Sequence, residues 1–179
     1  MSKQVLVIST SPRKGGNSDT LADEFVRGAQ EAGNNVEKIA LYDHTIGFCK
    51  GCLACQKTQR CVIRDDADTI AQKMLTADIL VFATPIYYYG ICGQMKTMLD
   101  RANPLFSADY QFRNIYLLAA AAEANEHTAD GAVTALQGWI DCFEKSRLSG
   151  IVFAGGVTSV GDIRNHPALK KAYEMGRAV

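Results

Sequence analysis

One stretch near the amino terminus, residues 9–18 with the sequence STSPRKGGNS, constrains the fold of this chain more than any other. It follows a β-branched run at residues 5–8, and it precedes apolar residues at helical spacing, Leu21, Phe25, Val26 and Ala29. A strand, a loop of small residues and a helix in this order place backbone N–H groups and a helix N-terminus around one concavity, which suits a phosphate group. The stretch therefore predicts an anion-binding turn.

Side chains of the same stretch can complete such a site. Hydroxyl and amide groups add hydrogen bonds and a guanidinium adds positive charge; the candidates are Ser9, Ser11, Arg13, Asn17 and Ser18. The alternative is an ordinary strand-to-helix turn that Asn17 or Ser18 caps. The chain contains neither G-x-G-x-x-G nor G-x-x-x-x-G-K-[ST], which disfavours dinucleotide and nucleoside triphosphate loops and leaves a mononucleotide phosphate.

Residues 84–90, with the sequence TPIYYYG, form a second candidate site. Adjacent tyrosines offer flat aromatic surface with polar tips, and a glycine lets the backbone approach a ligand closely. An isoalloxazine ring needs amides for its pyrimidine edge and apolar walls that exclude water. The candidate ring contacts are Pro85, Ile86, Tyr87, Tyr88, Tyr89 and Gly90, and the alternative is that the tyrosines simply pack beneath a loop.

Strand and helix patterns alternate along the chain. Strands are predicted at residues 5–8, 36–41, 79–83, 114–121 and 151–154, with Thr84-Pro85 ending the third. Helices are predicted after residue 18, from the Asp65-Asp66 cap to residue 76, through residues 95–102, through 133–143, and from Pro167 onward. Such alternation indicates a doubly wound parallel sheet, in which the loops at residues 9–18, 84–93 and 120–128 lie close together.

The two loop sequences resemble those of a known family. Residues 9–18 are similar to the FMN-phosphate loop G-S-P-R-K-x-G-N-T/S of the flavodoxin-like NADPH-dependent FMN reductases, with Thr10 in place of the glycine. Residues 84–90 resemble the family's flavin loop, and residues 94–101 resemble the helix that follows it. The resemblance implies a five-stranded sheet of order 2-1-3-4-5, FMN on these two loops, NAD(P)H as electron donor and a homodimer or homotetramer. The third flavin loop, around residues 119–125, stays unassigned.

Four cysteines, Cys49, Cys52, Cys55 and Cys61, have the spacing C-x2-C-x2-C-x5-C. Compact spacing of this kind suits a cubane iron–sulfur cluster better than zinc, whose sites use two separated pairs. It resembles the motif of the iron–sulfur flavoproteins, a branch of the same family that carries a 4Fe-4S cluster. Because the loop follows the second strand, we expect it on the flavin side of the sheet. The alternative is a set of redox-active or vestigial thiols, whereas Cys92 and Cys142 are expected to be structural.

Composition limits the remaining possibilities. Lys plus Arg and Asp plus Glu both number 19, and no basic run appears, so we expect neither nucleic acid nor membrane as a partner. The longest apolar run, residues 115–122, is far below the roughly 20 residues of a membrane helix. With no charged-then-apolar leader at its start, the chain is expected to be cytoplasmic with reduced thiols. The three histidines match no metal or triad spacing.

We therefore expect one flavodoxin-like domain over residues 1–179, with a cysteine-rich loop at about residues 42–66. The leading function is an FMN-dependent oxidoreductase that NAD(P)H reduces and a quinone, free flavin or another acceptor reoxidises. No catalytic side chain is assigned, because the cofactor carries the chemistry. One alternative is an electron carrier that relays electrons between a 4Fe-4S cluster and FMN, with a ferredoxin-like partner. Another is a flavin-binding sensor module.

Overall fold

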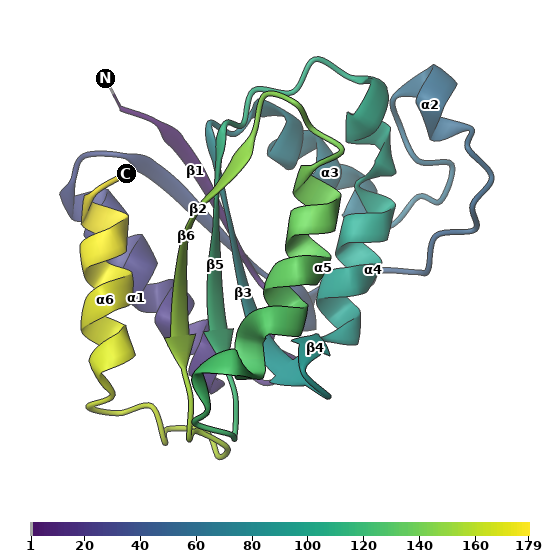
Figure 1. Ribbon diagram of the computed structural model, residues 1–179. Helices are drawn as coiled ribbons and strands as arrows, with labels where there is room; N and C mark the ends of the chain where they lie inside the picture. Colours follow the sequence, from purple (N-terminus) through teal and green to yellow (C-terminus); the bar gives the residue numbers. More distant parts are fainter. Residues whose placement is uncertain (1) are drawn as a thin grey trace.

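The computed structural model describes residues 2–179 and has a parallel sheet between two layers of helices (Figure 1). The sheet order is β2-β1-β3-β5-β6, with a short β4 paired to β3. The strands are β1 (Gln4–Ser9), β2 (Asn35–Ala40), β3 (Ile79–Tyr87), β4 (Gly90–Ile91), β5 (Asn114–Ala120) and β6 (Arg147–Ala154). Counted along the chain, the five parallel strands have the order 2-1-3-4-5, so the predicted flavodoxin-like fold is confirmed.

Two helices, α1 (Asn17–Glu31) and α6 (Pro167–Arg177), cover one face of the sheet. The other face carries α3 (Asp66–Thr76), α4 (Gly93–Arg101) and α5 (Asp130–Ile140). Helices α1 and α6 pack at backbone contact, since a Cβ atom on Gly176 would lie 2.1 Å from the Phe25 carbonyl oxygen. Shorter helical turns are η1 (Leu41–Asp43), α2 (Cys55–Thr58), η2 (Asn103–Ser107) and η3 (Glu126–Ala129).

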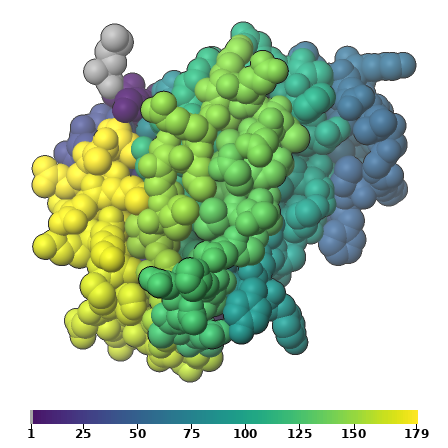
Figure 2. Space-filling view, viewed as in Figure 1, coloured from purple at the N-terminus to yellow at the C-terminus, as the bar shows by residue number. Residues whose placement is uncertain are grey.

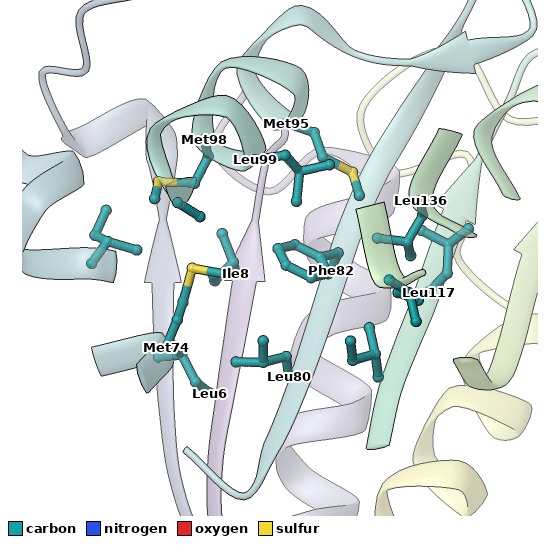
Figure 3. Packing of buried hydrophobic residues seen from close by; sticks show 14 of the residues in the cluster. Leu6, Ile8, Met74, Leu80, Phe82, Met95, Met98, Leu99, Leu117 and Leu136 are labelled. Atoms are coloured by element: carbon teal, nitrogen blue, oxygen red, sulfur yellow. The ribbon is translucent and has the colours of Figure 1, made fainter. Parts of the chain in front are cut away.

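The core has one apolar layer on each face of the sheet. Alternate residues of β1 enter different layers: Leu6 and Ile8 pack toward α3, α4 and α5, and Val5 and Val7 pack toward α1 and α6. Figure 3 shows the first of these layers, where Met95 and Met98 of α4 lie over Phe82 and the strands. The methionines at helical spacing are thus core residues.

Strand β3 is longer than the sequence predicted. It continues through Pro85 to Tyr87, where it turns back as β4. Proline lacks a backbone N–H, but β1 ends at Ser9, opposite Ala83, so no strand on that side needs the missing donor. Pro85 still pairs on its other side with Ala120 of β5. The prediction that Thr84-Pro85 ends the strand is therefore wrong.

Capping residues set the ends of two helices. The Asp65 side chain accepts a hydrogen bond from the Ala67 N–H at the start of α3, as predicted. At the start of α6, His166 Nδ1 accepts from the Ala168 N–H, so this histidine is a cap. Helix α5 ends at Ile140, earlier than predicted, and Phe143 beyond it stacks edge-on against Tyr110.

The long connection between β2 and α3 contains η1 and α2 but is otherwise irregular. We call residues 44–65 the cysteine loop. Figure 2 shows it as one edge of the molecule, and in Figure 1 it runs beside α4. Within the described residues, no helix is long and apolar enough to cross a bilayer.

Candidate functional site

A cavity of about 370 Å³ opens at the carboxyl ends of the parallel strands. The three loops expected to meet there all contribute. Its lining residues are Ser11, Arg13, Asn17, Ser18, Pro85, Ile86, Tyr87, Ala120, Ala121, Ala122, Val157 and Thr158. Because the carboxyl edge at a strand-order reversal is where open α/β sheets bind ligands, the cavity is the candidate functional site.

The loop after β1 is closed by its own side chain. Ser11 Oγ donates to the Arg13 carbonyl oxygen at 2.8 Å and accepts from the Arg13 N–H at 3.1 Å. Gly16 packs directly against this turn, and a Cβ atom there would lie 2.6 Å from Ser11 Oγ. Gly15 has a φ of 64°, which glycine adopts without strain. The small residues of the sequence are thus needed to make the turn.

The first turn of α1 contains an unpartnered buried hydroxyl. Ser18 is 2% exposed, and its Oγ has no hydrogen-bond partner among the described residues. No side chain caps α1, whose N-cap residue is Gly16, so the ordinary capped turn that the sequence left open is not what forms. An unpaired hydroxyl beside the positive end of a helix dipole fits the phosphate of FMN.

Two neighbouring side chains tie this loop to the segment after β6. Arg13 Nη2 donates to the Thr158 carbonyl oxygen at 2.9 Å, and Asn17 Oδ1 accepts from the Ile163 N–H. Asp162 accepts from the N–H groups of Thr158 and Ser159, and these two bonds lower the pKa of its carboxyl. Val157 and Thr158 were not predicted as site residues, although their position directly after the fifth strand indicates the carboxyl edge of the sheet.

A partly buried ion pair supports the loop at residues 9–18. Asp19 Oδ2 accepts from the Gly15 N–H at 3.0 Å, and Lys38 Nζ lies 2.7 Å from Asp19 Oδ1. Burial raises the pKa of Asp19, but the ion pair with Lys38 and the hydrogen bond from the Gly15 N–H lower it on balance. Ser9 is fully buried in this layer and does not line the cavity. Asp19 and Lys38 were not singled out from the sequence, because their contact joins α1 to β2.

The three tyrosines form a tight hairpin turn rather than a continuous wall. Tyr87 lines the cavity, whereas Tyr88 and Tyr89 occupy the turn to Gly90 with φ values of 49° and 62°. Such left-handed conformations are strained for bulky residues and are common at functional sites. Tyr88 is fully exposed, at 102%. Of the six predicted ring contacts, the structure thus brings Pro85, Ile86 and Tyr87 to the same cavity as the loop at residues 9–18.

A hydrogen bond crosses from this hairpin to the loop after β5. Tyr89 Oη donates to Glu123 Oε2 at 2.8 Å, and the pKa of Tyr89 is raised by that bond. The hairpin also rests on α5, because a Cβ atom on Gly131 would lie 2.3 Å from the Tyr89 carbonyl oxygen. Beside it, Ala120, Ala121 and Ala122 line the cavity, so these small residues supply the third wall that the sequence left unassigned.

The four motif cysteines border a second cavity, of about 420 Å³. Its other lining includes Asp100, Asn103, Trp139 and Cys142, which lie at the carboxyl-terminal ends of α4 and α5. The cavity at the carboxyl ends of the strands, which we call the FMN-type cavity, lies at the opposite ends of these helices. The expectation that the cysteine loop stays on the flavin side of the sheet is therefore wrong, because the loop runs along α4 to its far end.

The cysteine thiols border this cavity without meeting at one point. Across residues 2–179, no three His, Cys, Asp or Glu side chains converge closely enough to hold a metal ion. The number and softness of the donors fit a 4Fe-4S cluster, and holding one requires the loop to draw its thiols together. The ligand set Cys49, Cys52, Cys55 and Cys61 stays a prediction.

The other cysteines have different surroundings. Cys92 is buried, and its Sγ donates to the Thr10 carbonyl oxygen and lies 3.2 Å from Thr10 Oγ1, which joins β1 to the start of α4. This packing fits the expected structural role. Cys142 is exposed and borders the cavity of the motif cysteines, which its sequence position did not indicate.

The strand order and the cavity at the carboxyl edge define a flavodoxin-like α/β protein. The family model described as NADPH-dependent FMN reductase matches residues 4–159. The chain therefore belongs to the NADPH-dependent FMN reductase family.

Individual relatives agree with this assignment. The chain is 38% identical over 111 residues to an iron-sulfur flavoprotein of Methanocaldococcus jannaschii, an alignment that covers 62% of this chain and 57% of that protein. It is 29% identical to a putative NAD(P)H-dependent FMN-containing oxidoreductase of Bacillus subtilis, with 96% of each chain covered. The fold resembles the NAD(P)H:quinone oxidoreductase from Methanothermobacter marburgensis, with a TM-score of 0.77, 18% identity and coverage of 99% and 96%.

Proposed function

We propose that this chain is an FMN-dependent oxidoreductase whose flavin is reduced by NAD(P)H and reoxidised by a quinone, free flavin or another small-molecule acceptor. The observation that carries the proposal is the unpartnered Ser18 hydroxyl at the start of α1, inside a cavity lined by the predicted loop residues. The family assignment and the Bacillus subtilis relative support the same reaction class. Bound FMN would supply the hydride and electron transfer chemistry.

The residues of the chain then bind and orient the cofactor. Ser18 and the N-terminus of α1 would hold the phosphate, with Arg13 adding positive charge at the edge of the loop. Pro85, Ile86 and Tyr87 would flank the ring on one side, and the small side chains of residues 120–122 leave it room on the other. Tyr88, Tyr89 and Gly90 form the rim, where an acceptor or the nicotinamide would approach.

The test is steady-state NAD(P)H oxidation by the FMN-loaded protein with quinone, flavin and ferricyanide acceptors. We expect turnover that falls in Ser18→Ala at limiting FMN and is unchanged in Ser149→Ala, whose hydroxyl bonds Asn114 on the exposed start of β6. Absence of NAD(P)H oxidation with every acceptor, in protein that retains FMN, would contradict the proposal.

A second candidate function is an electron carrier with a 4Fe-4S cluster on Cys49, Cys52, Cys55 and Cys61. The observation that favours it is that all four thiols border one cavity. The similarity to an iron-sulfur flavoprotein supports it too. Iron and sulfide analysis of anaerobically purified protein tests it: about four irons per chain are expected, as the cube requires, and iron-free protein with full FMN content would contradict it.

The arrangement of the two cavities bears on such a relay. Helix α4 has nine residues and separates them by about 13 Å along its axis, at 1.5 Å per residue. Electron exchange between copies in a homodimer or homotetramer would avoid this path, and a ferredoxin-like protein could reach the exposed cysteines. The resemblance to the family supports such an oligomer. Light scattering tests it, and a monomer at all concentrations would contradict the oligomer.

A further inference from the structure

Lys38 of β2 pairs with a carboxylate that belongs to the proposed phosphate-binding turn. Asp19, in the first turn of α1, is 3% exposed, and its Oδ2 accepts from the Gly15 N–H at 3.0 Å. Lys38 Nζ lies 2.7 Å from Asp19 Oδ1 and donates to Asp23 Oδ1 at 2.5 Å. Burial lowers the pKa of Lys38, but its bonds to Asp19 and Asp23 raise it on balance, so the ammonium group is charged at neutral pH.

The backbone donors of the turn at residues 9–18 are largely used within it. The N–H of Gly15 bonds to the carboxylate just described. The Gly16 N–H donates to the Arg13 carbonyl oxygen at 3.1 Å, and the Arg13 N–H donates to Ser11 Oγ at 3.1 Å. A phosphate is therefore left with the Ser18 hydroxyl and the first N–H groups of α1, which have no acceptor within their own helix.

The carboxylate lies close enough to act on a phosphate bound there. Asp19 follows Ser18 directly, and consecutive Cα atoms are about 3.8 Å apart, so its charge acts within the Debye length of about 10 Å at 0.1 M salt. An uncompensated carboxylate at this position would repel a dianion and oppose the attraction of the helix N-terminus. Neutralising it is therefore a requirement of the anion site as well as of the fold.

We propose that Lys38 is a positioning residue whose charge, by neutralising Asp19, lets the turn prefer a dianionic phosphate monoester over a neutral ligand. Asp19 holds the left-handed conformation of Gly15 by accepting its N–H, and Lys38 cancels the repulsion that this carboxylate exerts on the phosphate. The inference rests on the proposed FMN function and states what sets the selectivity of its phosphate end. An ion pair with a structural role alone would affect ligands with and without a phosphate alike.

The test compares the affinities of FMN and riboflavin by calorimetry on cofactor-free, full-length protein. In Lys38→Met we expect the preference for FMN to fall about tenfold, because FMN binds more weakly while riboflavin binds as in wild type. Lys38→Arg keeps the charge and should keep the preference. The matched control is Lys73→Met, which removes a lysine of α3 that pairs with Glu37, also on β2, and should change neither affinity.

Substitution of the carboxylate should have the opposite sign. Asp19→Asn keeps an oxygen that can accept from the Gly15 N–H but removes the negative charge, so the preference for FMN should rise. The rise should be about threefold, smaller than the loss in Lys38→Met, because Asp23 still balances part of the Lys38 charge. In the double variant Lys38→Met with Asp19→Asn, the preference should return to within about twofold of wild type. These two variants decide the question even if Lys38→Met alone does not fold.

Two results would overturn the role of Lys38. One is a preference for FMN that stays at the wild-type value in Lys38→Met and Asp19→Asn, which would leave the phosphate site standing without this residue. The other is a loss of FMN and riboflavin affinity to the same extent in both variants, which a structural ion pair predicts. If wild-type protein binds the two ligands equally, the proposed phosphate site itself fails, and the role of Lys38 fails with it.

Discussion

The two ends of α4 carry two different kinds of site. At its start, Cys92 joins Thr10 and Thr84 in a buried contact beside a cavity whose proposed phosphate end is made by a helix N-terminus and a short turn. At its other end, four thiols on a long irregular loop border a cavity without converging. The geometry of a site built on regular elements is set by the sheet and its helices, whereas a site on an irregular loop depends on its ligand for the final geometry.

Breaking the ion pair between Arg101, in the last turn of α4, and Asp65, at the end of the cysteine loop, should have the largest effect. Arg101→Leu leaves the Asp65 carboxylate without its buried partner, which should lower the free energy of unfolding by about 3–5 kcal/mol. Urea denaturation measures this change. FMN affinity of the variant that remains folded should equal that of wild type, because the phosphate loop lies at the other end of α4. An unchanged urea midpoint would show that the Arg101–Asp65 ion pair does not contribute this free energy.

Obstructing the proposed phosphate loop at residues 9–18 should instead weaken FMN binding. In Gly16→Val the new side chain would collide with Ser11 Oγ, so the turn cannot close around a phosphate. We expect FMN affinity to fall about 100-fold, the loss of one or two hydrogen bonds to a charged group. Fluorescence titration measures it, and Gly138→Val on α5, where no atom lies within 4 Å of the new Cβ, is the control. Equal affinities for both variants would argue against this loop as the phosphate site.

Acid should lower the stability of the protein by protonating carboxylates near both cavities. The pKa of Asp68 is lowered first by its hydrogen bond from Arg60, and those of Asp19 and Asp65 are lowered by their cationic partners against the effect of burial. A lowered pKa in the folded state gives stability that is complete above the unfolded value of about 3.9 and is lost as pH falls through the folded value. The free energy of unfolding should therefore drop below about pH 4.

Urea denaturation at several pH values, with Asp65→Asn as the comparison, measures this dependence. The variant should be less stable than wild type at neutral pH, and the difference should shrink in acid. A constant difference from pH 7 to pH 3 would mean that Asp65 does not titrate in this way.

The smallest effect is expected at the tyrosine hairpin. Tyr88 has a φ of 49° and a fully exposed side chain, so Tyr88→Asn removes strain without removing packing. The free energy of unfolding should rise by about 0.5–1 kcal/mol. Thermal denaturation can detect this change. A loss of stability would show that the Tyr88 ring makes contacts that stabilise the chain.

Features that depend on residues close together in the chain could be predicted from the sequence. The turn at residues 9–18, the cap at Asp65 and the alternation of strands and helices follow from short-range periodicity and turn chemistry, whereas the strand order was implied by the resemblance to a known family. The ring contacts were predicted in part, because a hairpin at Tyr88 and Tyr89 needs two bulky residues in a left-handed conformation that local preference opposes.

Contacts between distant residues could not be predicted in this way. The path of the cysteine loop depends on Arg101 and Asp65, which are 36 positions apart. Thr158 reaches the phosphate loop through Arg13, 145 positions away. Pairings of this length leave no periodic signal in one sequence. The position of the cysteine cavity at the far end of α4 and the contribution of Val157 and Thr158 to the FMN-type cavity therefore could be seen only in the structure.

The most direct test of the FMN site compares the affinities of FMN and riboflavin, which differ only in the phosphate, by calorimetry on cofactor-free protein. If Ser18 and the N-terminus of α1 hold that phosphate, FMN should bind about 100-fold more tightly than riboflavin. Ser18→Ala should narrow this ratio about tenfold by weakening FMN alone. Equal affinities of wild-type protein for FMN and riboflavin would contradict the account.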